Sequence, residues 1–190
     1  MRNQVEHFAV LENCTVIEGH LQIRLIEFSP EEDFNSLSFP DLREITDYVL
    51  LYRVYGLRSL AHMFPNLSVV RGQHLFYDYA LVVFEMPDLE ELGLQGMTRI
   101  LRGAVRIEKN PQLCYIDTVD WSVLGVNRED NFILQNKAVN ECFNMCPKNK
   151  DGTDKCHLRT ITVDLDDDYT QASCWNADSC QKGMTELHQL

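Results

Sequence analysis

The chain has 190 residues, of which 45% are hydrophobic and 24% are charged, and its net charge at pH 7 is −12. A chain of this length can bury about 70% of the surface that it exposes when unfolded, so it can form one substantial domain with a small addition. The negative charge argues against a nucleic-acid interface or an anionic membrane surface, because both partners are bound by basic residues. No segment is apolar over the length of about 18 residues that a membrane span requires, and the N-terminus lacks the apolar core of a secretory signal.

Seven cysteines are the first informative feature of the sequence. Cys14 and Cys114 stand apart, whereas the others lie between residues 142 and 180. Sequons at Asn13 and Asn66 are potential N-glycosylation sites. Cysteines and sequons together indicate a disulfide-bonded extracellular protein. The odd number leaves one cysteine without a partner inside the chain, and without a signal peptide we expect a processed or incomplete chain.

Short segments repeat between residues 10 and 120. The sequence VIEG at 16–19 returns as VVRG at 69–72 and as ILRG at 100–103, and EITD at 44–47 occupies the same place with Asp instead of Gly. Such a repeat predicts a chain that turns a corner once in every coil of a solenoid, because Gly and Asp accept the backbone geometry of tight bends.

A second repeated motif contains proline. It occurs at 39–42 (FPDL), 64–67 (FPNL) and 86–89 (MPDL), with spacings of 25 and 22 residues. These spacings are typical of solenoid coils, and Pro marks a corner because it fixes φ and cannot donate a hydrogen bond to a sheet. The stretches 41–46 and 57–63 are expected to form short helical turns at the coil edges.

Alternating strands follow the corners, at 21–24, 49–52 and 105–108. Strands at this spacing stack in parallel, and their inward residues form one continuous core. We therefore predict a mainly β fold, an irregular right-handed single-stranded β-helix. A leucine-rich solenoid is the second choice, because 89–94 matches the leucine spacing of that repeat but Met97 stands where the repeat places Asn.

The composition changes near residue 140, which predicts a domain of residues 1–142 and a small cysteine-rich addition that depends on cross-links. Cys142, Cys146, Cys156 and His157 could bind zinc, but without a second closely spaced pair disulfides are favoured. The acidic run 164–168 lacks the Gly and Glu of a calcium loop and is read as a solvated loop.

The outward side of the strands is the candidate functional surface. Apolar and aromatic residues rimmed by charge are typical of a protein-binding sheet face. Packing against other parts of the same domain explains the pattern equally well, so both interpretations stay open. A slip in the alternation at 73–79 predicts a bulge. The residues that alternation suggests for this side are Leu50, Tyr52, Phe76, Tyr79, Val82 and Phe84, with Arg53, Arg106, Glu108 and Lys109 among them.

Catalytic motifs are missing from the sequence: there is neither a nucleophile elbow nor a glycine-rich phosphate loop. β-Helices can carry glycosidases with paired carboxylates, for which Glu108, Asp117 and Asp120 are the candidates. We favour ordinary surface acids at these positions, and we expect neither an enzyme nor a cofactor.

Several long segments resemble the first L domain of the insulin and insulin-like growth factor receptors, and the resemblance covers about residues 2–182. It implies a right-handed β-helix over 1–142 and the beginning of a furin-like cysteine-rich region over 143–182. Residues 183–190 depart from the family, which continues with more cysteines. The segments that carry the resemblance are 11–23 (LENCTVIEGHLQI), 45–57 (ITDYVLLYRVYGL), 63–72 (MFPNLSVVRG), 79–86 (YALVVFEM) and 106–110 (RIEKN) continuing to Asp120 and Trp121.

The resemblance also implies a disulfide pairing. Cys14 would pair with a cysteine that precedes this chain, which accounts for the odd number. The implied pairs within the chain are Cys114 with Cys142, Cys146 with Cys174, and Cys156 with Cys180.

The function that the resemblance implies is capture of an insulin-like peptide on the sheet face, together with a helix from the C-terminal end of the partner α-chain. The receptor would be a homodimer at the cell surface with a separate intracellular tyrosine kinase. The alternative is a truncated, secreted decoy that sequesters the hormone. Glu27 departs from the aromatic residue of vertebrate receptors, and Phe28 follows it. The implied contacts are Arg2, Asn3, Gln22, Leu25, Tyr52, Arg53, Phe76, Tyr77, Tyr79, Val82, Phe84, Arg106, Glu108 and Lys109.

Overall fold

In the computed structural model of the chain, residues 5–27, 34–162 and 168–182 are described. Arg2, Asn3 and Phe28, most of the acidic run 164–168, and the segment 183–190 lie outside the described residues. No helix in the described part is long and apolar enough to cross a membrane.

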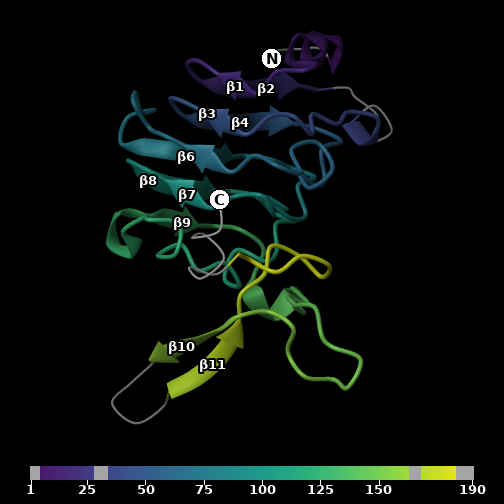
Figure 1. The fold of residues 1–190 in the computed structure, drawn as a ribbon, viewed down its shortest axis with the longest axis vertical. Helices are drawn as coiled ribbons and strands as arrows, with labels where there is room; N and C mark the ends of the chain where they lie inside the picture. Colours follow the sequence, from purple (N-terminus) through teal and green to yellow (C-terminus); the bar gives the residue numbers. More distant parts are fainter. Residues whose placement is uncertain (1–4, 28–33, 163–167, 183–190) are drawn as a thin grey trace.

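Two sheets of parallel strands run along the stacked coils (Figure 1); each of the first four coils contributes one short and one long strand, and the next contributes the long strand β9 alone. This arrangement confirms the predicted mainly β solenoid. The short sheet has the order β1 (Val16–Ile17), β3 (Glu44–Ile45), β5 (Val69–Val70), β7 (Arg99–Ile100). The long sheet has the order β2 (Leu21–Ile26), β4 (Val49–Val54), β6 (Tyr79–Phe84), β8 (Ala104–Glu108), β9 (Phe132–Leu134).

The remaining elements lie outside these two sheets. The 3-10 turns are η1 (Val5–Leu11), η2 (Arg128–Asp130) and η3 (Val139–Glu141). An antiparallel hairpin of β10 (Leu158–Thr162) and β11 (Asp168–Ala172) projects from the C-terminal end of the solenoid (Figure 1).

The core forms because equivalent residues of successive long strands are aligned with one another. Ile23, Leu51, Val83 and Ile107 occupy the same position in successive long strands, and each is 0% exposed. Full burial of each such side chain favours folding by about 1.5–3 kcal/mol. Stacking the coils therefore produces a continuous apolar column that a single coil could not bury.

Some details differ from the sequence-based expectations. Ile100, not Leu101, lies opposite Val70, because the fourth coil has one more residue before Gly103. The motif at 86–89 follows β6 and belongs to another corner, whereas 39–42 and 64–67 precede β3 and β5. The stretches 41–46 and 57–63 contain turns and a strand but no helix.

A column of left-handed residues ends each long strand. The residue that follows the outward-facing Arg24, Tyr52, Phe84, Glu108 or Leu134 has φ between 49° and 59° and is never glycine. This conformation interrupts the alternation, so two consecutive residues stay outside and the next one turns inward. The outer face thereby becomes wider than simple alternation allows. The left-handed residues are Leu25, Arg53, Glu85, Lys109 and Gln135.

The C-terminal region closes the end of the solenoid. Disulfides join Cys114 to Cys142, Cys146 to Cys174 and Cys156 to Cys180, the same pairs that the family resemblance implies. Trp175 is 1% exposed and belongs to the same hydrophobic core as the strands. Its ring meets Trp121 edge to face at a centroid distance of 6.0 Å. The hydrophobic core therefore extends across the boundary that the sequence predicts at residue 142.

Candidate binding face

The side of the long sheet that points away from the core carries two columns of residues that are in register from strand to strand. We call the surface that these columns form the outer face. Because strand partners are in register, residues far apart in sequence become neighbours here. One column contains Gln22, Leu50, Val82, Arg106 and Phe132, and the next contains Arg24, Tyr52, Phe84, Glu108 and Leu134.

A hollow of about 300 Å³ lies at the centre of the outer face. Leu50 and Val82 are 5% and 2% exposed, yet they do not belong to the interior core. This volume lies at the lower end of the range of about 300–1,000 Å³ found for ligand pockets. The residues that line the hollow are Arg24, Leu50, Tyr52, Phe76, Val82, Phe84 and Arg106.

Aromatic rings stand on two sides of the hollow. Tyr52 and Phe84 are stacked, with centroids 5.5 Å apart and an interplanar angle of 10°. On the other side, Tyr48 packs against Phe76 at 5.6 Å, and Phe76 meets Tyr77 edge to face at 5.1 Å. Stacked rings lose little conformational freedom on binding, which suits them to hold an apolar partner residue.

Arg106 is the charged centre of the outer face. Its guanidinium lies within 5.3–5.9 Å of the ring centroids of Tyr79, Phe84 and Phe132. It also donates hydrogen bonds of 3.1 and 2.6 Å to the Glu108 carboxylate. Lys109 approaches the same carboxylate at 3.8 Å. The Glu108 carboxylate is therefore held by two cations.

A second ion pair borders the outer face. Arg53 donates to Glu85 at 2.6 Å, and this hydrogen bond raises the pKa of the Arg53 guanidinium. Both residues belong to the left-handed column. The edge of the outer face thus carries charges held in place by the backbone conformation beneath them.

The structure brings most of the residues of the expected contact set onto or beside the outer face. Tyr77 is the most exposed of them, at 81%. Arg2 and Asn3 lie outside the described residues. Glu27 follows β2 and is exposed. The residues placed here by the structure are Gln22, Leu25, Tyr52, Arg53, Phe76, Tyr77, Tyr79, Val82, Phe84, Arg106, Glu108 and Lys109.

Sequence reasoning missed part of the outer face. Arg24 was recognisable, since alternation already directs it outward from β2. Phe132 and Leu134 on β9 are 40% and 52% exposed, and they extend the apolar strip by one strand. The alternation of Phe132 and Leu134 with the inward-facing Ile133 is the sequence signal that could have identified them.

The other candidate residues lie elsewhere. Cys14 is free and half-buried. Asn13 and Asn66 are exposed, and their glycosylation stays a prediction. Asp120 accepts hydrogen bonds from the backbone and hydroxyl of Ser122, the role of a turn residue. In the part of the chain that the structure describes, no group of three or more His, Cys, Asp or Glu is placed to hold a metal.

Comparison with known proteins agrees with this architecture. Residues 13–125 match the Receptor L domain family. The chain is 50% identical over 187 residues to an insulin-like peptide receptor of Branchiostoma lanceolatum, covering 98% of the chain. It is 49% identical to both the insulin receptor and the insulin-like growth factor 1 receptor of Xenopus laevis, each covering 96% of the chain. The chain spans 13% of the length of each of these relatives.

Proposed function

Because this chain belongs to the insulin receptor family and forms its receptor L domain, we propose that the outer face captures an insulin-like peptide outside the cell. The observation that carries the proposal is the apolar hollow between aromatic walls, with Arg106 held at its side. Aromatic residues and Arg supply most of the binding energy in protein interfaces. An interface of this kind would use Leu50 and Val82 as its floor.

A partner helix completes the site in this proposal. Stable protein interfaces bury about 1,600 Å² in total, and a shallow hollow of about 300 Å³ receives only a few side chains. A helix from the C-terminal end of the partner α-chain would add apolar surface and cover the hollow. The receptor is then a homodimer in which one chain supplies the sheet and its partner supplies the helix.

The chain itself contributes binding and no chemistry. Glu108 is neutralised by Arg106 and Lys109. The phosphoryl transfer that follows hormone binding would belong to a tyrosine kinase domain elsewhere in the receptor, inside the cell.

Alanine substitutions test the outer face. Phe84→Ala removes a ring that stacks on Tyr52 beside the hollow, and Arg106→Ala removes the cation that contacts three aromatic rings. Each substitution is expected to weaken binding of the insulin-like peptide by more than about 1 kcal/mol. The measurement is titration calorimetry of each variant with insulin and a synthetic α-chain helix.

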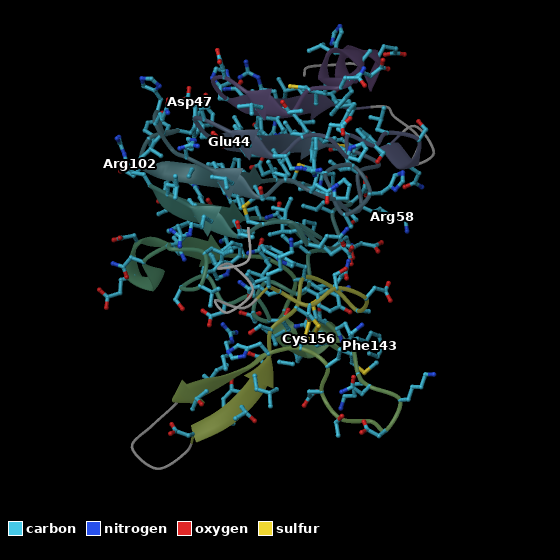
Figure 2. The ribbon with its side chains drawn as sticks, viewed as in Figure 1. Glu44, Asp47, Arg58, Arg102, Phe143 and Cys156 are labelled. Atoms are coloured by element: carbon cyan, nitrogen blue, oxygen red, sulfur yellow. A yellow bond between two sulfur atoms is a disulfide. The ribbon has the colours of Figure 1, made fainter. Side chains whose placement is uncertain are left out.

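Phe143→Ala is the matched control, because Phe143 is 89% exposed and lies in the cysteine-rich segment, below the two stacked sheets in the view of Figure 2. This variant should bind like the parent chain. Unchanged affinity in both Phe84→Ala and Arg106→Ala would exclude the outer face as the hormone site.

Omitting the helix separates a receptor from a decoy. With Cys14 alkylated, the chain is titrated with insulin or insulin-like growth factor 1 in the presence and absence of the helix peptide. Saturable binding that requires the helix supports the receptor fragment. Tight binding without the helix supports a self-sufficient decoy.

A further inference from the structure

Arg24 differs from the other cations of the outer face because no described carboxylate forms an ion pair with it. Arg106 is bonded to Glu108 and Arg53 to Glu85. Within the described ranges 5–27, 34–162 and 168–182, no carboxylate lies within ion-pair distance of the Arg24 guanidinium. Arg24 is half-buried and lines the hollow.

The position of Arg24 in the sheet determines which part of a bound helix can contact it. Arg24 lies on β2, opposite Tyr52 on β4, and the floor of the hollow spans β4 and β6. Neighbouring strands are about 4.8 Å apart, and one helical turn advances about 5.4 Å. A helix that crosses the strands therefore places successive turns over successive strands. A side chain one turn from the residue in the hollow faces Arg24.

From this unpaired guanidinium we infer that the outer face selects a partner helix that carries a carboxylate one helical turn from its apolar anchor. The inference rests on the proposed function, since it names the chemistry of the helix that covers the hollow. The apolar anchor enters between Tyr52 and Phe84 on one side and Phe76 on the other. The Asp or Glu side chain of the helix then forms a bidentate pair with Arg24.

The preference for a helix with a carboxylate follows from the loss of water around the Arg24 guanidinium. A helix laid over the hollow removes water from Arg24, and burial of an unpaired charge is strongly unfavourable. A carboxylate opposite Arg24 offsets that cost, whereas an amide offsets little and a Lys adds repulsion. The carboxylates already on the outer face cannot serve, because Glu85 and Glu108 are held by other cations. Arg24 thus discriminates among helices with the same apolar face.

Synthetic helices provide the test. The probes are 16-residue amphipathic peptides with a central Phe and one Glu four residues before or after it, each paired with a Gln analogue. The full chain, with Cys14 alkylated, should bind one Glu peptide about tenfold more tightly than its Gln analogue, the size expected for a charge-assisted pair. Arg24→Leu should abolish this preference, mainly by raising the affinity for the Gln peptide, because that peptide no longer covers an unpaired charge.

A charge reversal and a matched control complete the design. Arg24→Glu should prefer a Lys peptide over the Glu peptide. Arg99→Leu, an exposed arginine on β7 of the short sheet, should retain the original preference. Phe84→Ala should weaken binding of the Glu and Gln peptides equally.

The outcomes separate the two proposals. A preference for Glu that persists in Arg24→Leu overturns the role of Arg24, and so does a parent chain that binds none of the peptides. Neither result touches the proposed function, which the titration with insulin and the α-chain helix decides independently.

Discussion

Glu44 and Arg71 face each other across the short sheet. Arg71 donates from Nε to one carboxylate oxygen and from Nη2 to the other at 3.0 Å. The hydrogen bond with Arg71 lowers the pKa of Glu44. This pair joins β3 to the residue after β5, so it links two coils by their side chains as well as by their backbones.

The pair makes part of the stability depend on pH. The pKa of Glu44 is lower in the folded chain than its ordinary value of 4.5, so its stabilising contribution is complete above that value and is lost as pH falls through the folded pKa. Arg71→Leu should unfold at lower urea concentration at pH 7 and approach the parent chain as pH falls through the lowered pKa of Glu44. A difference that stays constant from pH 7 to pH 3 would contradict this assignment.

At the scale of strands and turns, the left-handed column determines the width of the outer face, and Asn110 stabilises its inner side. Asn110 is 0% exposed and follows Lys109, a member of that column. Its amide donates to the Val83 carbonyl at 3.1 Å and accepts from the Met86 N–H at 3.0 Å. It also donates to Asn136 at 2.8 Å, which continues the contact to the coil that contains β9.

Removing this amide should destabilise the whole stack. Asn110→Ala deprives the buried Met86 N–H and Val83 C=O of a partner, and each unsatisfied buried group costs about 1–3 kcal/mol. We expect a loss of about 2 kcal/mol or more in the free energy of unfolding, measured by urea titration with circular dichroism. Gln112→Ala, at an exposed position, is the control and should change stability little. Equal stability of Asn110→Ala and the parent chain would show that water replaces the amide.

Across the whole molecule, the cysteine-rich segment serves as the cap of the solenoid. A solenoid exposes apolar surface at its ends unless a terminal element covers it. Trp175 supplies that cover, and Thr118 donates to the carbonyl of Cys174 at 2.9 Å. Asn176 donates to Glu91 at 2.7 Å, and Gln181 donates to the Asp120 carbonyl at 2.8 Å. The segment is therefore held to the solenoid by apolar contacts in the shared core and by hydrogen bonds to its loops.

The cap should unfold together with the strands. Trp175→Ala creates a cavity in the shared core and is expected to reduce the free energy of unfolding by about 3–5 kcal/mol, with Trp175→Phe losing less. Urea unfolding followed by circular dichroism should show one transition in the parent chain. Two separate transitions, with only one affected by Trp175→Ala, would mean that the cysteine-rich segment folds independently.

The strands and their stacking were accessible from sequence because they depend on local signals. Alternation identified the inward positions of β2, β4 and β8, and the Gly repeat located the corners before the long strands. The motif at 86–89 misled the spacing argument, because its Pro marks a corner of another kind. The register of the fourth coil was one residue off, since a one-residue insertion leaves the pattern of apolar residues almost unchanged.

The amino-acid sequence by itself determined the solenoid class, the cysteine-rich addition and, by resemblance, the receptor family, since each depends on periodicity or on long motifs. Tertiary structure alone decided the shape of the outer face. Left-handed residues such as Arg53 and Lys109 carry no local signal, because L side chains disfavour that conformation and only neighbouring coils impose it. Tertiary structure also decided which cation of the outer face forms an ion pair. Arg106 has Glu108 beside it, whereas no carboxylate among the described residues pairs with Arg24, because pairing depends on what adjacent strands bring into contact.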